Sequence, residues 1–125
     1  MKDNELTAGL LRALSTVRPP VLTSEYDLHA LIAAALQGGG FVVAHEVRLA
    51  PGCRIDFLAG RVGLEIKRGH PQRRTLLAQC ERYLRQDALD ALIVVVEASV
   101  SLPDTLAGKP LIVFGLNRLW GIALP

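Results

Sequence analysis

The stretch RIDFLAGRVGLEIK, residues 54–67, decides the fold of this 125-residue chain. Each of its two halves, 54–59 and 62–67, alternates in polarity with the period of a β-strand. Gly60-Arg61 separates the halves, and a glycine in the first of two turn positions suits a type II′ turn. The stretch therefore predicts a β-hairpin in which Asp56 lies directly opposite Glu65.

The predicted hairpin brings three charged side chains onto one face. Cross-strand partners have Cβ atoms roughly 4.5–5.5 Å apart, so the carboxylates of Asp56 and Glu65 would repel each other. Lys67 follows Glu65 by two residues and shares its face, while Leu64 and Ile66 point into the core. Facing carboxylates suit a hard cation such as Mg²⁺, and a nearby lysine suits phosphoryl chemistry, where it orients a nucleophile or stabilises charge.

Helical and strand patterns continue on both sides of the hairpin. Helices are predicted from Asn4 to Pro19-Pro20, from an N-cap at Thr23 or Ser24 to the triple glycine at 38–40, and over 72–86. Strands are predicted from Phe41 to Leu49 and over 91–97, 111–114 and 119–124, the last two around a turn at 115–118. The apolar run 92–96 is typical of a strand that is covered on both faces.

These elements predict an α/β protein with the order α-α-β-β-β-α-β-(β-β). The helix over 72–86 would cross over between parallel strands, which gives a mixed β-sheet flanked by helices. A chain of 125 residues is expected to form a single domain. Within it we distinguish a leading helix (1–20), a core (24–97) and C-terminal strands (98–125).

Composition narrows the class of protein. Half of the residues are hydrophobic and 21% are charged, which is enough to bury a core. No uncharged apolar run reaches the roughly 18–20 residues of a membrane helix. Charged residues near the start do not fit a signal peptide, and Cys53 and Cys80 lie far apart without metal-ligand spacing. We expect a cytoplasmic protein with reduced thiols and no membrane partner.

Charge is distributed unevenly along the chain. The formal net charge is only +2, but residues 54–85 contain eight basic and three acidic side chains, so this segment carries +5. A local basic field in a nearly neutral protein indicates an anionic partner, most often a nucleic acid. The basic residues nearest the hairpin end are Arg68, Arg73 and Arg74, which we interpret as phosphate contacts.

The residues of the hairpin resemble the core of the PD-(D/E)XK nuclease superfamily, in which an Asp at a strand end is followed by Glu-x-Lys on the paired strand. Here these residues are Asp56 and Glu65-Ile66-Lys67. The family's acidic residue on the preceding helix corresponds to Glu25, and the Gln-x-x-x-Tyr of RecB-type members corresponds to Gln79 to Tyr83. The chain departs from the motif at Ile55, where the family's name has proline.

The resemblance implies a restriction-endonuclease-like fold and a Mg²⁺-dependent deoxyribonuclease. It implies that Glu25, Asp56 and Glu65 hold Mg²⁺ or Mn²⁺ with the carbonyl of Ile66, that Lys67 serves the nucleophilic water, and that Gln79 supports the site. The small size favours structure-specific or sequence-independent contact with DNA. A homodimer, as in small archaeal Holliday-junction resolvases, would place two sites on one substrate.

The sequence leaves other interpretations open. Asp56 and Glu65 can be solvated strand residues with Lys67 as an ion-pair partner, and Glu25 can simply favour the helix N-terminus. Gln79 can be a satisfied core amide, and Tyr83 is expected to be core packing. The triple glycine follows a helix, so it predicts a C-cap rather than a nucleotide phosphate loop, and no nucleotide cofactor is expected. The main alternative function is a non-catalytic nucleic-acid- or protein-binding module, and the weaker one is an unrelated α/β protein.

Overall fold

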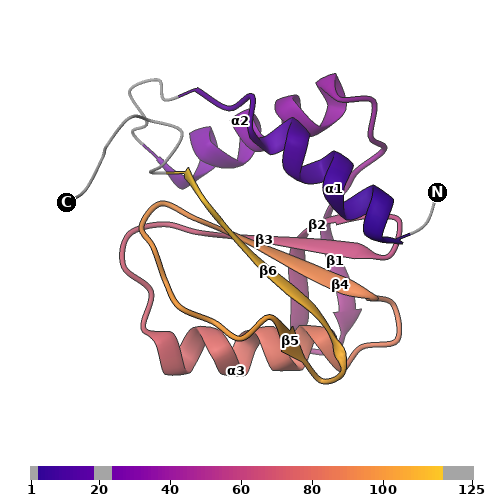
Figure 1. Cartoon of the computed structure of the whole chain (residues 1–125), viewed down its shortest axis with the longest axis vertical. Coiled ribbons are helices and arrows are strands. Elements are labelled where there is room, and N and C mark those ends of the chain that lie inside the picture. The colour runs from indigo at the N-terminus through magenta and orange to yellow at the C-terminus, as the bar shows by residue number, and fades with distance from the viewer. Residues whose placement is uncertain (1–2, 19–23, 117–125) are drawn as a thin grey trace.

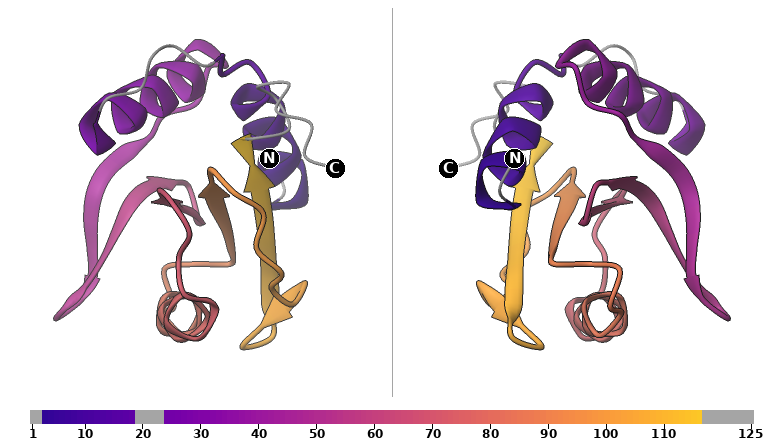
Figure 2. Two further views of the ribbon diagram at one scale, coloured as in Figure 1. Left: turned by 90° about the vertical axis from the view of Figure 1, so that its left-hand side faces the viewer. Right: turned by 90° about the vertical axis from the view of Figure 1, so that its right-hand side faces the viewer.

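A computed structural model describes residues 3–18 and 24–116. They form an α/β fold whose six-stranded mixed sheet has the order β1-β2-β3-β4-β6-β5. Figures 1 and 2 show three layers, with α1 and α2 on one face of the twisted sheet and α3 on the other. The predicted class, a mixed sheet flanked by helices, is therefore confirmed.

The three predicted helices are present, but the first begins before the predicted N-cap Asn4 and ends at Leu14, ahead of the predicted stop at Pro19-Pro20. α1 spans Asp3–Leu14, α2 spans Glu25–Gly38 and α3 spans Arg73–Leu84. Ser24 caps α2 by accepting the backbone N–H of Asp27 at 3.0 Å, as one of the two predicted N-caps. None of the helices in the described residues is long and apolar enough to cross a membrane.

The strands are β1 (Ala44–Ala50), β2 (Cys53–Ala59), β3 (Val62–Lys67), β4 (Ala91–Val96), β5 (Thr105–Leu106) and β6 (Lys109–Gly115). The first three form an antiparallel meander. The chain then crosses over through α3, so that β4 pairs in parallel with β3 and with β6. The short strand β5 closes the other edge as an antiparallel partner of β6.

The predicted hairpin register is confirmed. Phe57 pairs with Leu64 and Ala59 with Val62, which leaves Gly60-Arg61 as the two turn residues. Gly60 has a φ of +58° while Arg61 does not have a positive φ, as a type II′ turn requires.

The sheet is buried between two apolar clusters. Alternate residues of β4 belong to opposite clusters, with Ile93 and Val95 facing α1 and α2 and with Leu92 and Val94 facing α3. All six residues of β4 are buried, as the apolar run 92–96 predicted. Packing against helices on both faces thus fixes the positions of β3 and β4, including the C-terminal end of β3 at Lys67.

The prediction that a strand begins at Phe41 is wrong, because β1 begins at Ala44. The chain leaves α2 through a Schellman-type turn, in which Gly40 has a φ of +89° and the N–H of Phe41 is bonded to the carbonyl of Leu36 at 3.1 Å. The ring of Phe41 then packs against α1, so close to Gly9 that a Cβ there would lie 2.8 Å from it. Tertiary packing between the helices therefore overrides the β-propensity of Phe41.

The C-terminal third also differs in part from the prediction. The strand predicted over 111–114 is present as the longer β6, but the sequence did not predict β5, which has only two residues. The predicted strand at 119–124 and the second half of the turn before it lie outside the described residues.

Candidate active site

An irregularity in β1 and β2 positions the first site residue. Phe57 packs with the cluster under α1 and α2, but Ile55 packs with the cluster under α3, although a regular strand would place both on one face. The partners of these residues on β1, His45 and Val47, keep the register on both sides of the break. Glu46 lies between those partners with a φ of +49°, a left-handed conformation that is rare for a side chain of its kind.

The irregularity separates two carboxylates that were expected to share a face. Asp56 lines a pocket beside α2, whereas Glu65 is turned towards α3. The two remain level with each other, because the backbone N–H of Asp56 donates to Glu65 Oε1 at 3.1 Å and that of Ile66 donates to Asp56 Oδ2 at 2.8 Å. Each carboxylate thus accepts a hydrogen bond from the opposite strand. The expectation of two carboxylates facing each other on one side of the hairpin is wrong.

Glu65 is buried in a hydrogen-bond network with α3. It is 5% exposed, and its Oε2 lies 3.0 Å from the hydroxyl of Tyr83 and 3.3 Å from the amide nitrogen of Gln79. The same amide donates to the Tyr83 hydroxyl at 3.0 Å, and that hydroxyl lies 2.8 Å from the carbonyl oxygen of Arg54. Gln79 therefore reaches Glu65 as the resemblance implied, and Tyr83 does more than fill the core.

Burial and charge make Glu65 a weak acid. Desolvation, followed by the negative charge of Asp56, raises the pKa of Glu65 to about 7, while the N–H of Asp56 and the charge of Lys67 act in the opposite direction. Burial and the same carboxyl also raise the pKa of Tyr83. The Tyr83 hydroxyl has one hydrogen and two acceptors within reach, Glu65 Oε2 and the carbonyl oxygen of Arg54, and its bond to Glu65 also acts to lower the pKa of that carboxyl.

Lys67 completes the group on the α3 side. Its Nζ lies 3.5 Å from Glu65 Oε2, and its side chain is 28% exposed. It also lines a small pocket of about 240 Å³ together with Gln79 and residues at the start of α3. The ammonium group is thus held next to the buried carboxyl and remains open to a ligand.

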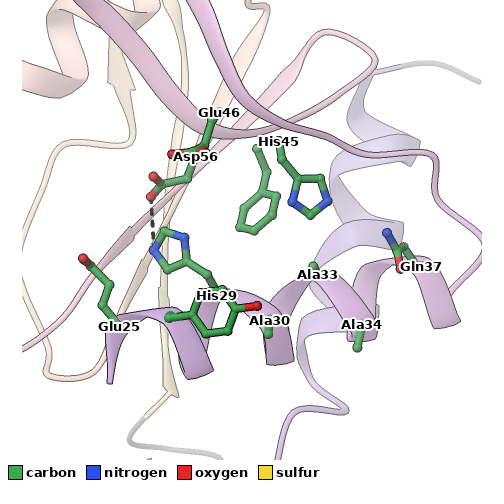
Figure 3. A pocket seen from close by; sticks show the side chains of 11 residues that line it. Glu25, His29, Ala30, Ala33, Ala34, Gln37, His45, Glu46 and Asp56 are labelled. Atoms are coloured by element: carbon green, nitrogen blue, oxygen red, sulfur yellow. Dashed lines mark ion pairs between the residues drawn. The ribbon is translucent and has the colours of Figure 1, made fainter. Parts of the chain in front are cut away.

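A larger pocket lies on the other side, between α2 and the β1–β2 hairpin, with a volume of about 590 Å³. In Figure 3, Glu25 and His29 lie on α2, and Asp56, Glu46 and His45 point into the pocket from the β1–β2 hairpin. Glu25 therefore lies in the same pocket as Asp56, although its side chain is exposed. The Nε2 atom of His29 lies 3.8 Å from Asp56 Oδ2, which is too far for a hydrogen bond.

The three predicted phosphate contacts differ in their surroundings. Arg68 pairs with Glu97 at 3.1 Å, and the Nε of Arg73 donates to the carbonyl of Ser101 at 2.7 Å. Arg74 is exposed in the first turn of α3, and no ion pair or hydrogen bond of its side chain is found within the described residues. Arg74 is consequently the best placed of the three to meet a ligand.

Within 3–18 and 24–116, no three His, Cys, Asp or Glu side chains converge into a ready-made metal site. The donor chemistry nevertheless suits a hard cation, because Asp56 and Glu65 carry carboxylate oxygens on neighbouring strands, each bonded to a backbone N–H of the other strand. A divalent cation would replace the proton that their mutual repulsion favours on Glu65. The oxygen chemistry of the two carboxylates is thus of the kind that Mg²⁺ or Mn²⁺ prefers, and Glu25 lines the same pocket as Asp56.

Three residues of this region were not found by sequence reasoning. Tyr83 was expected to be packing only, and its Gln-x-x-x-Tyr spacing was the available signal for its contact with Glu65. His29 follows Glu25 by one helical turn, so it shares the face of α2 that turns to Asp56. Glu46 had no local signal, since its left-handed conformation depends on the pairing of β1 with β2.

Comparison with protein-family models, with curated proteins and with solved structures finds no match to this chain.

Proposed function

We propose that this protein is a metal-dependent phosphodiesterase that cleaves DNA, built on a restriction-endonuclease-like fold. The observation that carries the proposal is the linkage of Asp56 on β2 to Glu65 near the end of β3 by hydrogen bonds across the two strands, with Lys67, Gln79 and Tyr83 in contact with Glu65. The succession of α2, the meander β1–β3, the crossover α3 and the parallel strand β4 supports the fold assignment.

In this proposal Asp56, Glu65 and the carbonyl of Ile66 hold Mg²⁺ or Mn²⁺, with Glu25 as a further carboxylate. The cation supplies Lewis acidity towards a phosphate and lowers the pKa of a bound water. Gln79 and Tyr83 fix the orientation of Glu65, because both bond to the same carboxyl oxygen. Lys67 provides positive charge where a phosphate would gain negative charge in the transition state.

Contacts with the DNA backbone are assigned to the segment that follows β3. Arg74 is exposed, and Arg68 and Arg73 keep further guanidinium N–H groups beyond those that bond within the chain. Such contacts position a nucleic acid without reading its sequence. A homodimer would place two such surfaces on one duplex or branched substrate.

A second candidate is a non-catalytic nucleic-acid-binding module. It is favoured by one observation: both oxygens of Glu65 already accept hydrogen bonds from the protein, so a cation must compete with them. The two functions differ in whether a divalent cation leads to strand cleavage.

The test is a cleavage assay with end-labelled single-stranded, duplex and branched DNA, in Mg²⁺, Mn²⁺ or chelator. We expect metal-dependent cleavage by the wild type, and a loss of about 10²-fold or more in Lys67→Ala with binding retained. Lys109→Ala serves as the matched control, because that lysine bonds to the carbonyl of Gln86, away from the site. Equal cleavage by Lys67→Ala and wild type would exclude Lys67 from the reaction, and metal-independent binding without cleavage of any substrate would favour the binding module.

A further inference from the structure

Two parallel strands end side by side next to the candidate site. β3 and β4 stay paired up to Lys67 and Val96 at their C-terminal ends. Arg68 and Glu97 are the residues that directly follow the two strands. In open α/β sheets ligands bind outside the carboxyl ends of the strands, so a ligand that reaches Lys67 is expected to meet this edge of the sheet.

Glu97 holds the first residues of the segment that follows β3. Its Oε1 atom accepts a hydrogen bond from Nε of Arg68 at 3.1 Å and one from the backbone N–H of Gly69 at 2.8 Å. Gly69 has a φ of +68°, which glycine adopts without strain. One carboxyl oxygen of β4's end thus fixes both the side chain of Arg68 and the main chain next to it.

The anchored guanidinium of Arg68 keeps its outer donors. Nε bonds to Glu97, but no hydrogen bond of either terminal nitrogen is found among residues 3–18 and 24–116. These two nitrogens form a fork that can bond bidentately to a phosphate, and the side chain is 32% exposed. A side chain that is already held in place loses less entropy on binding. The exposed Arg74 has no such anchor within the described part of the chain.

We propose that Glu97 is a positioning residue for DNA binding, which holds Arg68 so that its guanidinium bonds to a backbone phosphate beside the one at Lys67. This inference rests on the proposed function and adds to it a residue that does not itself touch the DNA. Glu97 then has two opposite effects, because its negative charge repels a phosphate while its hydrogen bonds orient Arg68. Since the two effects differ in sign, substitutions can separate them.

The test compares two neutral substitutions of Glu97. Glu97→Gln keeps an oxygen acceptor for Arg68 and Gly69, and its amide nitrogen takes the place of Oε2, for which no hydrogen bond is found in the described chain. Glu97→Ala has the same charge but no acceptor. Glu81→Gln and Glu81→Ala are the matched control, because Glu81 pairs with Arg85 at 3.3 Å near the other end of α3.

Affinity is measured by fluorescence anisotropy in chelator, which prevents metal-dependent cleavage. The probes are a labelled 20-base-pair duplex and one of its strands, and the variants are measured on the probe that the wild type binds more tightly. We expect Glu97→Gln to bind at least as tightly as the wild type, because it removes a negative charge. Glu97→Ala should bind about two- to tenfold more weakly than Glu97→Gln, the effect of releasing one long side chain.

Two comparisons check that the effect passes through Arg68. In an Arg68→Ala background, the two Glu97 substitutions should give equal affinities. The two Glu81 substitutions should give equal affinities in the otherwise wild-type protein.

Equal affinities of Glu97→Gln and Glu97→Ala would overturn the proposal, since Glu97 would then act through its charge alone. A difference that persists without Arg68, or a wild type that binds neither probe, would overturn it as well. Thermal melts show whether each variant is folded at the assay temperature. If Glu97→Ala is unfolded, Arg68→Lys decides: it keeps the charge but lacks Nε and the fork, so it should bind more weakly by a similar factor, and wild-type affinity would contradict the proposal.

These outcomes are separate from those of the cleavage assay. A wild type that cleaves DNA, together with equal binding by Glu97→Gln and Glu97→Ala, keeps the proposed function and loses the role of Glu97. A wild type that cleaves nothing, together with weaker binding by Glu97→Ala than by Glu97→Gln, keeps the role of Glu97 in DNA binding and loses the phosphodiesterase.

Discussion

Replacing Glu65 by glutamine should remove a pH dependence of stability that the wild type shows without a cation. Burial and Asp56 raise the pKa of Glu65 from 4.5 to about 7 in the folded protein. The folded state therefore binds more protons than the unfolded state between these values, so the free energy of unfolding falls as pH rises through this window. At about 1.4 kcal/mol per pH unit, the loss reaches up to about 3 kcal/mol and levels off above pH 7.

Urea unfolding at pH 5 and pH 8 in the presence of chelator measures this effect. With a typical slope of about 2 kcal/mol per molar urea, the wild-type midpoint should fall by about 1–2 M between the two pH values. Glu65→Gln has the shape and the hydrogen-bond donor of the protonated acid, so its midpoint should change much less. The variant keeps all three histidines, so it also controls for their contribution.

Two further results check the cause. Tyr83→Phe removes a hydrogen bond that lowers the pKa of Glu65, so it should move the transition to higher pH. At pH 8, millimolar Mn²⁺ should restore stability to the wild type by mass action, and restore little to Glu65→Gln. A wild-type midpoint that is the same at pH 5 and pH 8 would refute a raised pKa of Glu65 in the folded protein.

Three other predictions concern neighbouring residues. Asp56→Asn should move the pH-dependent loss of stability to lower pH, since the charge of Asp56 raises the pKa of Glu65, and urea unfolding at several pH values measures this shift. The same variant should lose stabilisation by Mn²⁺, which thermal melts with Mn²⁺ or with chelator measure. Arg74→Gln should reduce the slope of log affinity for DNA against log salt by about one unit, while Arg12→Gln on α1 leaves it unchanged; equal slopes in all three proteins would exclude a phosphate contact at Arg74. Glu46→Gly should match the wild type or gain up to about 1 kcal/mol in urea unfolding, because glycine adopts a φ of +49° without strain, and Glu46→Val should lose stability.

The sequence predicts the parts of the fold that depend on local chemistry. Gly60 has no Cβ to oppose a positive φ, so the hairpin turn and its register follow from the residues next to it. Ser24 caps α2 and the triple glycine ends it, and both effects act within one helical turn. Phe41 shows the limit of such reasoning, because its β-branched neighbours favour a strand while its ring is held between the two helices.

The sequence predicts which residues form the candidate site better than it predicts how they are arranged. Alternation along 54–67 places Asp56 opposite Glu65, and in the structure the backbone N–H of Asp56 donates to the Glu65 carboxylate while the N–H of Ile66 donates to the Asp56 carboxylate. The same alternation wrongly places both on one face, because it assumes a regular strand. The irregularity at Asp56 is matched by Glu46 on β1, which local sequence patterns do not relate to it.

This irregularity gives the two carboxylates different surroundings. Asp56 faces the open pocket beside α2, with a side chain that is 22% exposed, whereas Glu65 is enclosed by Gln79 and Tyr83 from α3. A regular strand would have placed Asp56 on the α3 side as well, with two adjacent acids competing for the same donors. Turning Asp56 to the other side leaves one acid oriented by the core and one accessible from the pocket, while their charges still interact. The left-handed backbone of Glu46 therefore accompanies the change of face that leaves Asp56 in the open pocket and Glu65 in the buried network.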